Sequence, residues 1–201
     1  MRIRLFFLTF LLDSLVASAP LTGTDGDMAQ DQAGPDCVST SLNALQWTAE
    51  NFYFHSSVIL SIPEHEKVID GWVSFNLTNS ALPFSMSCYA NSSGQEQAFF
   101  DGSQWLSCST PDQNTSEAKH TSGTFRFDRV MGRFDIAQRW FCPGEDGATF
   151  DASGTTNVTL DCATNRGKDA AWSPGQLYSM DAVACGLQNV TIIPDTVRAW
   201  A

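Results

Sequence analysis

Apolar and polar residues alternate along most of this chain. In residues 72–78, Val73, Phe75 and Leu77 alternate with serine, asparagine and threonine. The same period of two recurs in four later segments, 84–89, 125–128, 133–142 and 156–162. Alternation of this kind is typical of a β-strand with one buried face and one solvated face. The pattern therefore predicts a series of half-buried strands.

Less regular strands are predicted in four further segments, 47–60, 104–109, 176–185 and 188–193. Turn-rich pieces such as 143–147 and 173–175 separate the strands. No segment carries an apolar stripe with the helical period over three turns. We therefore expect an all-β fold, a single antiparallel β-barrel or sandwich.

The first 18 residues have the three parts of a secretory signal peptide. Arg2 and Arg4 form a basic start, residues 5–12 form an apolar core, and residues 17–19 supply the small side chains that a signal peptidase needs. Eight apolar residues are too few to cross roughly 30 Å of hydrocarbon. We therefore predict a removed signal over 1–18, no membrane anchor, and a secreted, extracellular protein.

The next segment, 19–36, is predicted to be a flexible acidic arm. It contains four aspartates, no basic residue and almost no large apolar side chain, so it cannot bury enough surface to offset the entropy of ordering it. The β-barrel domain is expected to span 37–194, and residues 195–201 to form a C-terminal tail.

The formal net charge of −11 narrows the choice of partners. Binding to nucleic acid or to an anionic membrane requires clustered lysine and arginine residues. We therefore predict neither a nucleic-acid partner nor a membrane partner, and no cofactor is expected.

The chain contains six cysteines, Cys37, Cys88, Cys108, Cys142, Cys162 and Cys185. An even number in a secreted domain indicates three disulfides. The CxxC pairs and the Cys/His clusters that are typical of zinc sites do not occur. The sequence therefore predicts a domain stapled by disulfides, without a metal.

Local pairs are favoured among the 15 connectivities that six cysteines allow. Cys88 and Cys108 end neighbouring strand-like segments, and Cys162 and Cys185 flank a second loop. These two pairs leave the remaining cysteines to tie down the N-terminal end of the domain.

That remaining pair would be Cys37 with Cys142. The alternative is a Cys37 that bonds to a second chain, which would give a disulfide-linked homodimer and leave Cys142 unpaired. Both arrangements stay open at this point.

Five Asn-x-Ser/Thr triplets are candidate glycosylation sites, at Asn76, Asn91, Asn114, Asn157 and Asn189. Asn76 and Asn157 fall on the polar positions of their predicted strands, where a glycan would point to solvent. The sites therefore agree with the strand assignment.

Catalytic chemistry is not indicated by the titratable residues. Glu64, His65 and Glu66 are neighbours in a polar loop, where adjacent side chains point in different directions. The strand-borne aspartates alternate with apolar residues and are expected to face outward, namely Asp128, Asp135 and Asp161. A Gly-x-Ser-x-Gly elbow and a facing carboxylate pair are both missing. We therefore predict that the protein is not an enzyme.

Six tryptophans could instead contact a ligand. Trp47 and Trp140 are expected in the core, whereas Trp72 and Trp105 fall on the polar side of their strands. Trp172, in the loop after residue 165, is the candidate ligand-binding residue. The alternative is that it forms an aromatic lid over one end of the barrel.

The order of these features resembles the Alternaria major-allergen family of secreted fungal proteins. The resemblance spans about 45 to 193 and rests on an ordered set of segments: Trp47, Gly71-Trp72-Val73-Ser74-Phe75-Asn76-Leu77, Phe84-Ser85-Met86-Ser87-Cys88, Gln104-Trp105-Leu106-Ser107-Cys108, Phe125-Arg126-Phe127-Asp128, Thr159-Leu160-Asp161-Cys162 and Cys185-Gly186. Cys142 and the loops 110–122 and 163–175 depart from it.

The resemblance implies a β-barrel with intrachain pairs that fit Cys88–Cys108 and Cys162–Cys185, and dimerisation in some members through an N-terminal cysteine. It also implies virulence, plant immune recognition and allergy, with no established catalytic residues. We expect a secreted fungal non-catalytic binding protein, effector- or allergen-like, whose partner is a host apoplastic protein or a cell-wall polysaccharide. The alternatives are a carbohydrate- or small-ligand-binding module and then a small secreted glycoside hydrolase.

Overall fold

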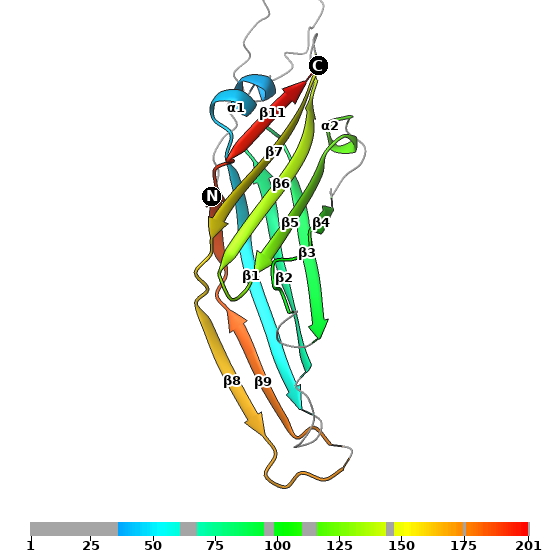
Figure 1. The fold of residues 1–201 in the computed structure, drawn as a ribbon, viewed down its shortest axis with the longest axis vertical. Helices are drawn as coiled ribbons and strands as arrows, with labels where there is room; N and C mark the ends of the chain where they lie inside the picture. Colours follow the sequence, from blue (N-terminus) through cyan, green and yellow to red (C-terminus); the bar gives the residue numbers. More distant parts are fainter. Residues whose placement is uncertain are drawn as a thin grey trace, which may run out of the picture. The chain divides into compact units, whose positions relative to one another are not determined.

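The computed structural model describes residues 36–60, 68–94, 99–109, 116–143, 147–174 and 176–200. The elements in order are α1 (Cys37–Asn43), β1 (Trp47–Leu60), β2 (Val68–Asn79), β3 (Ser85–Gly94), β4 (Leu106–Ser109), α2 (Ser116–Lys119), β5 (Ser122–Asp128), β6 (Arg133–Cys142), β7 (Ala148–Asn157), β8 (Cys162–Lys168), β9 (Ser179–Cys185), β10 (Gln188–Ile192) and β11 (Thr196–Trp200) (Figure 1). The predicted all-β class is confirmed. Neither helix in this part of the chain has the length and apolar character needed to cross a membrane.

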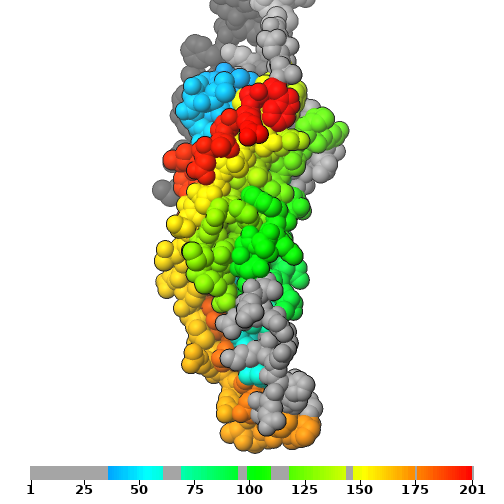
Figure 2. Space-filling model, viewed as in Figure 1, coloured from blue at the N-terminus to red at the C-terminus, as the bar shows by residue number. Residues whose placement is uncertain are grey.

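All the strands belong to one antiparallel sheet of 11 strands. Its order is β11-β7-β6-β5-β4-β3-β2-β1-β9-β8, and β10 pairs with the first half of β1. The outer face of β5, β6, β7 and β11 is visible in Figure 2. The sheet curls back toward itself, and β7 passes close to the end of β10. A Cβ built on Gly154 of β7 would lie only 3.0 Å from the Ile193 carbonyl oxygen, which shows how close the two segments are. It is therefore barrel-like, although the strand order does not close.

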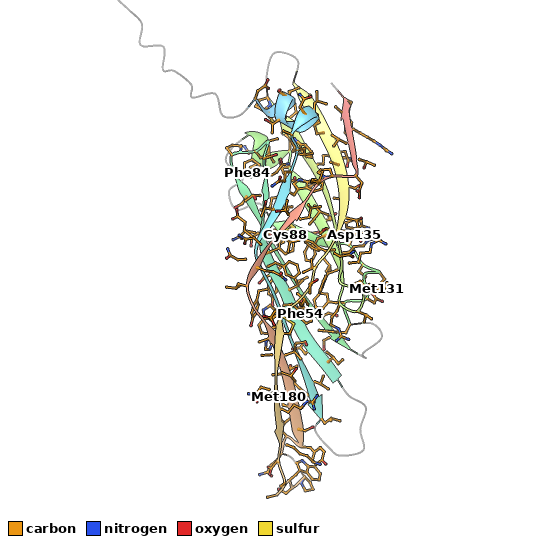
Figure 3. All side chains as sticks on the ribbon, turned by 90° about the vertical axis from the view of Figure 1, so that its left-hand side faces the viewer. Phe54, Phe84, Cys88, Met131, Asp135 and Met180 are labelled. Carbon is orange, nitrogen blue, oxygen red and sulfur yellow. A yellow bond between two sulfur atoms is a disulfide. The ribbon has the colours of Figure 1, made fainter. Side chains whose placement is uncertain are left out.

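The alternating apolar side chains meet inside this curved sheet. Phe52 lies 5.2 Å from Phe134 and 5.7 Å from Phe75, measured between ring centroids, so rings from both halves of the sheet are in contact. Phe54 continues this packing by contacting Phe127 on β5. Figure 3 labels Phe54 together with Cys88 on β3 and Asp135 on β6. Each buried phenylalanine contributes roughly 2–3 kcal/mol, so this aromatic layer is a main source of stability.

A β-bulge in β1 keeps both halves of that long strand facing the core. The buried positions change from Trp47 and Ala49 to Phe52 and Phe54, a change from odd to even numbers. The register shifts at the same place against both neighbours, and Asn51 has a φ of 54°. An asparagine tolerates this left-handed conformation better than most residues. The bulge also divides β1 between β10 and β9.

Three disulfides fasten the fold, Cys37–Cys142, Cys88–Cys108 and Cys162–Cys185. The last two join adjacent strands, and these are the local pairs favoured by the sequence. The first ties α1 to the end of β6, which agrees with the intrachain assignment of Cys37. Ser41 of α1 accepts a hydrogen bond of 3.0 Å from the Trp140 indole beside this bond.

The structure differs from the sequence-based prediction at two places. The strand predicted over 156–162 is wrong, because residues 158–161 connect β7 to β8. Val158 is nevertheless buried, and its amide donates a hydrogen bond of 2.7 Å to the Gly132 carbonyl. The apolar and polar residues thus alternate here in a connection between strands and not in a strand. The sheet also extends past the expected boundary at 194, since β11 pairs with β7. The signal peptide and residues 19–35 of the arm lie outside the described residues.

Candidate binding site

Trp172, the ligand-binding candidate, lies in the connection between β8 and β9. Its indole nitrogen donates a hydrogen bond of 2.8 Å to the Gln176 carbonyl, and its ring meets Tyr178 edge-on. The side chain thus contributes to the packing of its own turn. A role in ligand binding stays a prediction.

The four sequon asparagines within the described residues are all exposed, namely Asn76, Asn91, Asn157 and Asn189. The fifth, Asn114, lies outside them. Exposure is what glycan attachment requires, and the occupancy of each site stays a prediction. Asn76 and Asn91 share the outer face of β2 and β3, and Asn189 lies on β10.

The histidines form no acid–base constellation within the described part of the chain. His65 lies outside it, together with Glu64 and Glu66. His55 stacks on Trp72 with 4.2 Å between ring centroids, and its Nδ1 has no hydrogen-bond partner among the described residues. His120 is exposed beside Phe141. No group of three His, Cys, Asp or Glu side chains in the described segments is arranged to hold a metal ion.

Asp135 departs from the sequence prediction that the strand-borne aspartates are exposed. It stands on the outer face of β6 but is only 4% exposed. Two arginines cover it, with Arg126 Nε at 2.7 Å and Arg133 Nε at 3.1 Å, and Thr155 donates at 2.6 Å. Burial opposes ionisation of Asp135, but the hydrogen bonds from Thr155 and the arginines outweigh it and lower the pKa of its carboxyl. This fully bonded carboxylate is structural.

A shallow hollow on the outer face lies over β1, β2 and β3. It has a volume of about 500 Å³. The side chains that surround it come from those strands and from the connection after β9, and they are Asn51, Tyr53, Ser74, Asn76, Ser87, Tyr89 and Leu187. We call this the outer groove.

The strand register explains why the outer groove is hollow. Tyr53 faces Ser74 across β1 and β2, and Ser74 faces Tyr89 across β2 and β3. Ser87 lies opposite Asn76. Short serine side chains thus form the floor, with a tyrosine on either side of it. Phe75 and Cys88 point to the core at this level and are buried, so the floor is rigid.

The side chains that line the groove are aromatic, aliphatic or neutral polar, and Glu50 lies opposite Asn76 at its edge. Tyr89 is 59% exposed and Leu187 67% exposed. The hydroxyls of Tyr53 and Tyr89 have no hydrogen bond within the described residues, so both can bind a ligand. Tyr53 also contacts Trp72, with 6.5 Å between ring centroids, and this extends the aromatic surface toward His55.

The β1 bulge shapes one end of the groove. The backbone amide of Asn51 donates a hydrogen bond of 2.9 Å to the Asn189 side-chain oxygen. This bond joins the bulge to β10 and holds Asn51 at the groove. Sequence reasoning missed this site, although a tyrosine at a polar position of the 84–89 strand was a signal for it.

Comparison with known proteins assigns the chain to a family. Residues 49–185 match the family described as Alternaria alternata allergen 1. The chain belongs to this family. The predicted resemblance is thereby confirmed, and the family is not a known enzyme family. Searches of curated proteins and of solved structures gave no match.

The matched residues contain most of the outer groove. All its lining side chains except Leu187 fall within 49–185, as do both local disulfides. Cys37 and β11 lie outside the match. The third disulfide therefore ties a segment beyond the match to the family domain.

Proposed function

We propose that this protein is a secreted fungal binding protein without catalytic activity, which acts in an effector-like manner at a host or cell-wall surface. The observation that carries the proposal is the outer groove, a rigid, uncharged aromatic hollow in a domain of an allergen family. Three disulfides support secretion, because such bonds persist in oxidising compartments.

Exposed tyrosines suit this role. A tyrosine offers a large apolar ring and a hydroxyl at a small entropic cost, and it is enriched where proteins bind one another. The two groove tyrosines stand on paired strands rather than on loops, so their positions are fixed before a partner arrives.

A carbohydrate-binding module is the second candidate, and the composition of the groove favours it. Aromatic rings can pack against the apolar face of a sugar, while Asn51, Ser74 and Ser87 supply neutral polar groups for its hydroxyls. Among the described residues, the side chains that line the groove are uncharged, which favours a neutral ligand.

The test is a pull-down with the glycosylated, disulfide-intact protein. The protein is incubated with plant apoplastic fluid and, separately, with insoluble wall polysaccharides. Mass spectrometry identifies the host proteins that it retains and shows whether it is retained on the polysaccharides. Tyr89→Ala removes a groove ring, whereas Trp105→Ala removes an exposed ring beside β4 on the other part of the sheet. Recovery of a host protein that is lost only in Tyr89→Ala supports the proposal. Retention on polysaccharide alone supports the second candidate, and equal recovery with both variants contradicts a role of the groove.

A further inference from the structure

We infer that the N-linked glycan on Asn76 folds back into the outer groove, covers its tyrosines and so controls access to it. The inference rests on the proposed function only in taking this groove as the binding site. Its occupant is a neutral oligosaccharide carried by the chain itself.

The position of Asn76 is the first argument. Among the exposed sequon asparagines, Asn76 lines the outer groove, whereas Asn157 lies on β7. Asn91 lines a different hollow, of about 360 Å³, beside Asp101 and Ser103. A glycan on Asn76 thus begins inside the groove rather than at a distance from it.

The register places the tyrosines within reach of that glycan. Asn76 pairs with Ser87, and the next pair on the same face is Ser74 with Tyr89. Tyr89 is therefore the diagonal neighbour of Asn76, a relation that corresponds to about 7–8 Å between Cα atoms. The first sugars would pass over the two serines, whose short side chains leave room for them.

The groove also fits the chemistry of a sugar. The rings of Tyr53 and Tyr89 offer apolar faces, and their hydroxyls can each donate and accept a hydrogen bond. Leu187 adds an exposed apolar wall. An attached ligand reaches such a site at a high effective concentration, so even weak contacts keep it docked.

Control of access follows from this arrangement. A partner that binds the groove must displace the Asn76 glycan, so its apparent affinity falls by the fraction of time that the groove is open. Protein lacking this glycan presents Tyr89 and Leu187 to solvent. These side chains are then free to contact a partner.

The test measures how fast an endoglycosidase removes each glycan from the folded, disulfide-intact protein, followed site by site by mass spectrometry. Asn157 serves as the reference site because it is exposed on β7, away from the groove. A glycan docked about nine-tenths of the time would be released about tenfold more slowly than the reference. We expect this delay at Asn76, and we expect Tyr89→Ala to abolish it.

A second variant, Tyr53→Ala, keeps the test valid if Tyr89→Ala misfolds. Three results would overturn the inference: an Asn76 without a glycan, equal release at Asn76 and Asn157, or a delay that persists in both tyrosine variants. The assay uses no partner molecule, so its failure leaves the proposed function intact. Conversely, a failed pull-down leaves the docking of the glycan standing.

Discussion

The Cys37–Cys142 disulfide gives the sharpest prediction about stability. It closes a separation of 105 residues and connects α1 to β6, whereas Cys88–Cys108 closes a separation of 20 residues. The double variant Cys37→Ser/Cys142→Ala removes the long bond. The matched control, Cys88→Ala/Cys108→Ala, removes a local one.

The difference between the two bonds can be worked out from loop length. The chain-entropy relation gives about 4.8 kcal/mol for the long loop and about 3.3 kcal/mol for the short one at 25 °C. A helix of seven residues has little stability alone, so we also expect α1 to detach when the Cys37–Cys142 bond is lost. Loop length alone makes the long-bond variant lose about 1.5 kcal/mol more than the control, and detachment of α1 adds to this difference.

Equilibrium unfolding in guanidinium chloride, followed by tryptophan fluorescence, measures both losses under oxidising conditions. A long-bond variant as stable as the control or more stable would refute the entropy argument. A non-reducing gel tests the bond itself. If the wild type ran as a covalent dimer that Cys37→Ser converted to a monomer, Cys37 would be bonded to a second chain.

Two further substitutions test the ion pairs and the packing. Asp135→Asn should lower the free energy of unfolding by about 1–2 kcal/mol at pH 6, against about 0–0.5 kcal/mol for Asp151→Asn at a more exposed pair. Since the pKa of Asp135 is lowered below 3.8, this deficit is full above that pH and shrinks as the pH falls through the lowered pKa; a deficit unchanged at pH 2 would contradict the assignment. Gly71→Ala should cost about 3 kcal/mol, because its Cβ would overlap the His55 carbonyl oxygen. Gly167→Ala, whose Cβ has no neighbour closer than 3.7 Å, should stay within about 0.5 kcal/mol of wild type in a thermal melt.

The sequence predicts the strands that bury one face and misses those that bury neither. β2 and β6 alternate clearly because Val73 and Phe134 enter the core while their neighbours stay on the outer face. Every residue of β8 and of β11 is exposed, and β11 is only five residues long, so neither strand carries the sustained alternation of a half-buried strand. Both are edge strands held by backbone hydrogen bonds to one neighbour. Such pairing does not require apolar side chains, so the apolar pattern does not predict it.

The groove could be anticipated only in part. Trp72 and Tyr89 stand at polar positions of predicted strands, which indicates aromatic side chains on the outer face. Their meeting with Tyr53 depends on the register between three strands and on the bulge at Asn51. Register is set by the whole core and by the turns, so one chain's sequence does not specify which outward residues become neighbours. Asp135 is a similar case, since its cover comes from Arg126 and Thr155 on two neighbouring strands.

The same alternation separates binding from folding in this molecule. Along β3, Cys88 is buried and bonded to β4, while the adjacent Tyr89 projects into the groove. A change at Tyr89 therefore alters the groove and leaves the core contacts in place, whereas a change at Cys88 removes a buried disulfide beneath the groove. Variants of the groove tyrosines should consequently report on recognition alone. A Tyr89→Ala protein that unfolded as readily as a core variant would show that the groove also supports the fold. Lost binding in the pull-down could then no longer be attributed to the loss of a contact with the partner.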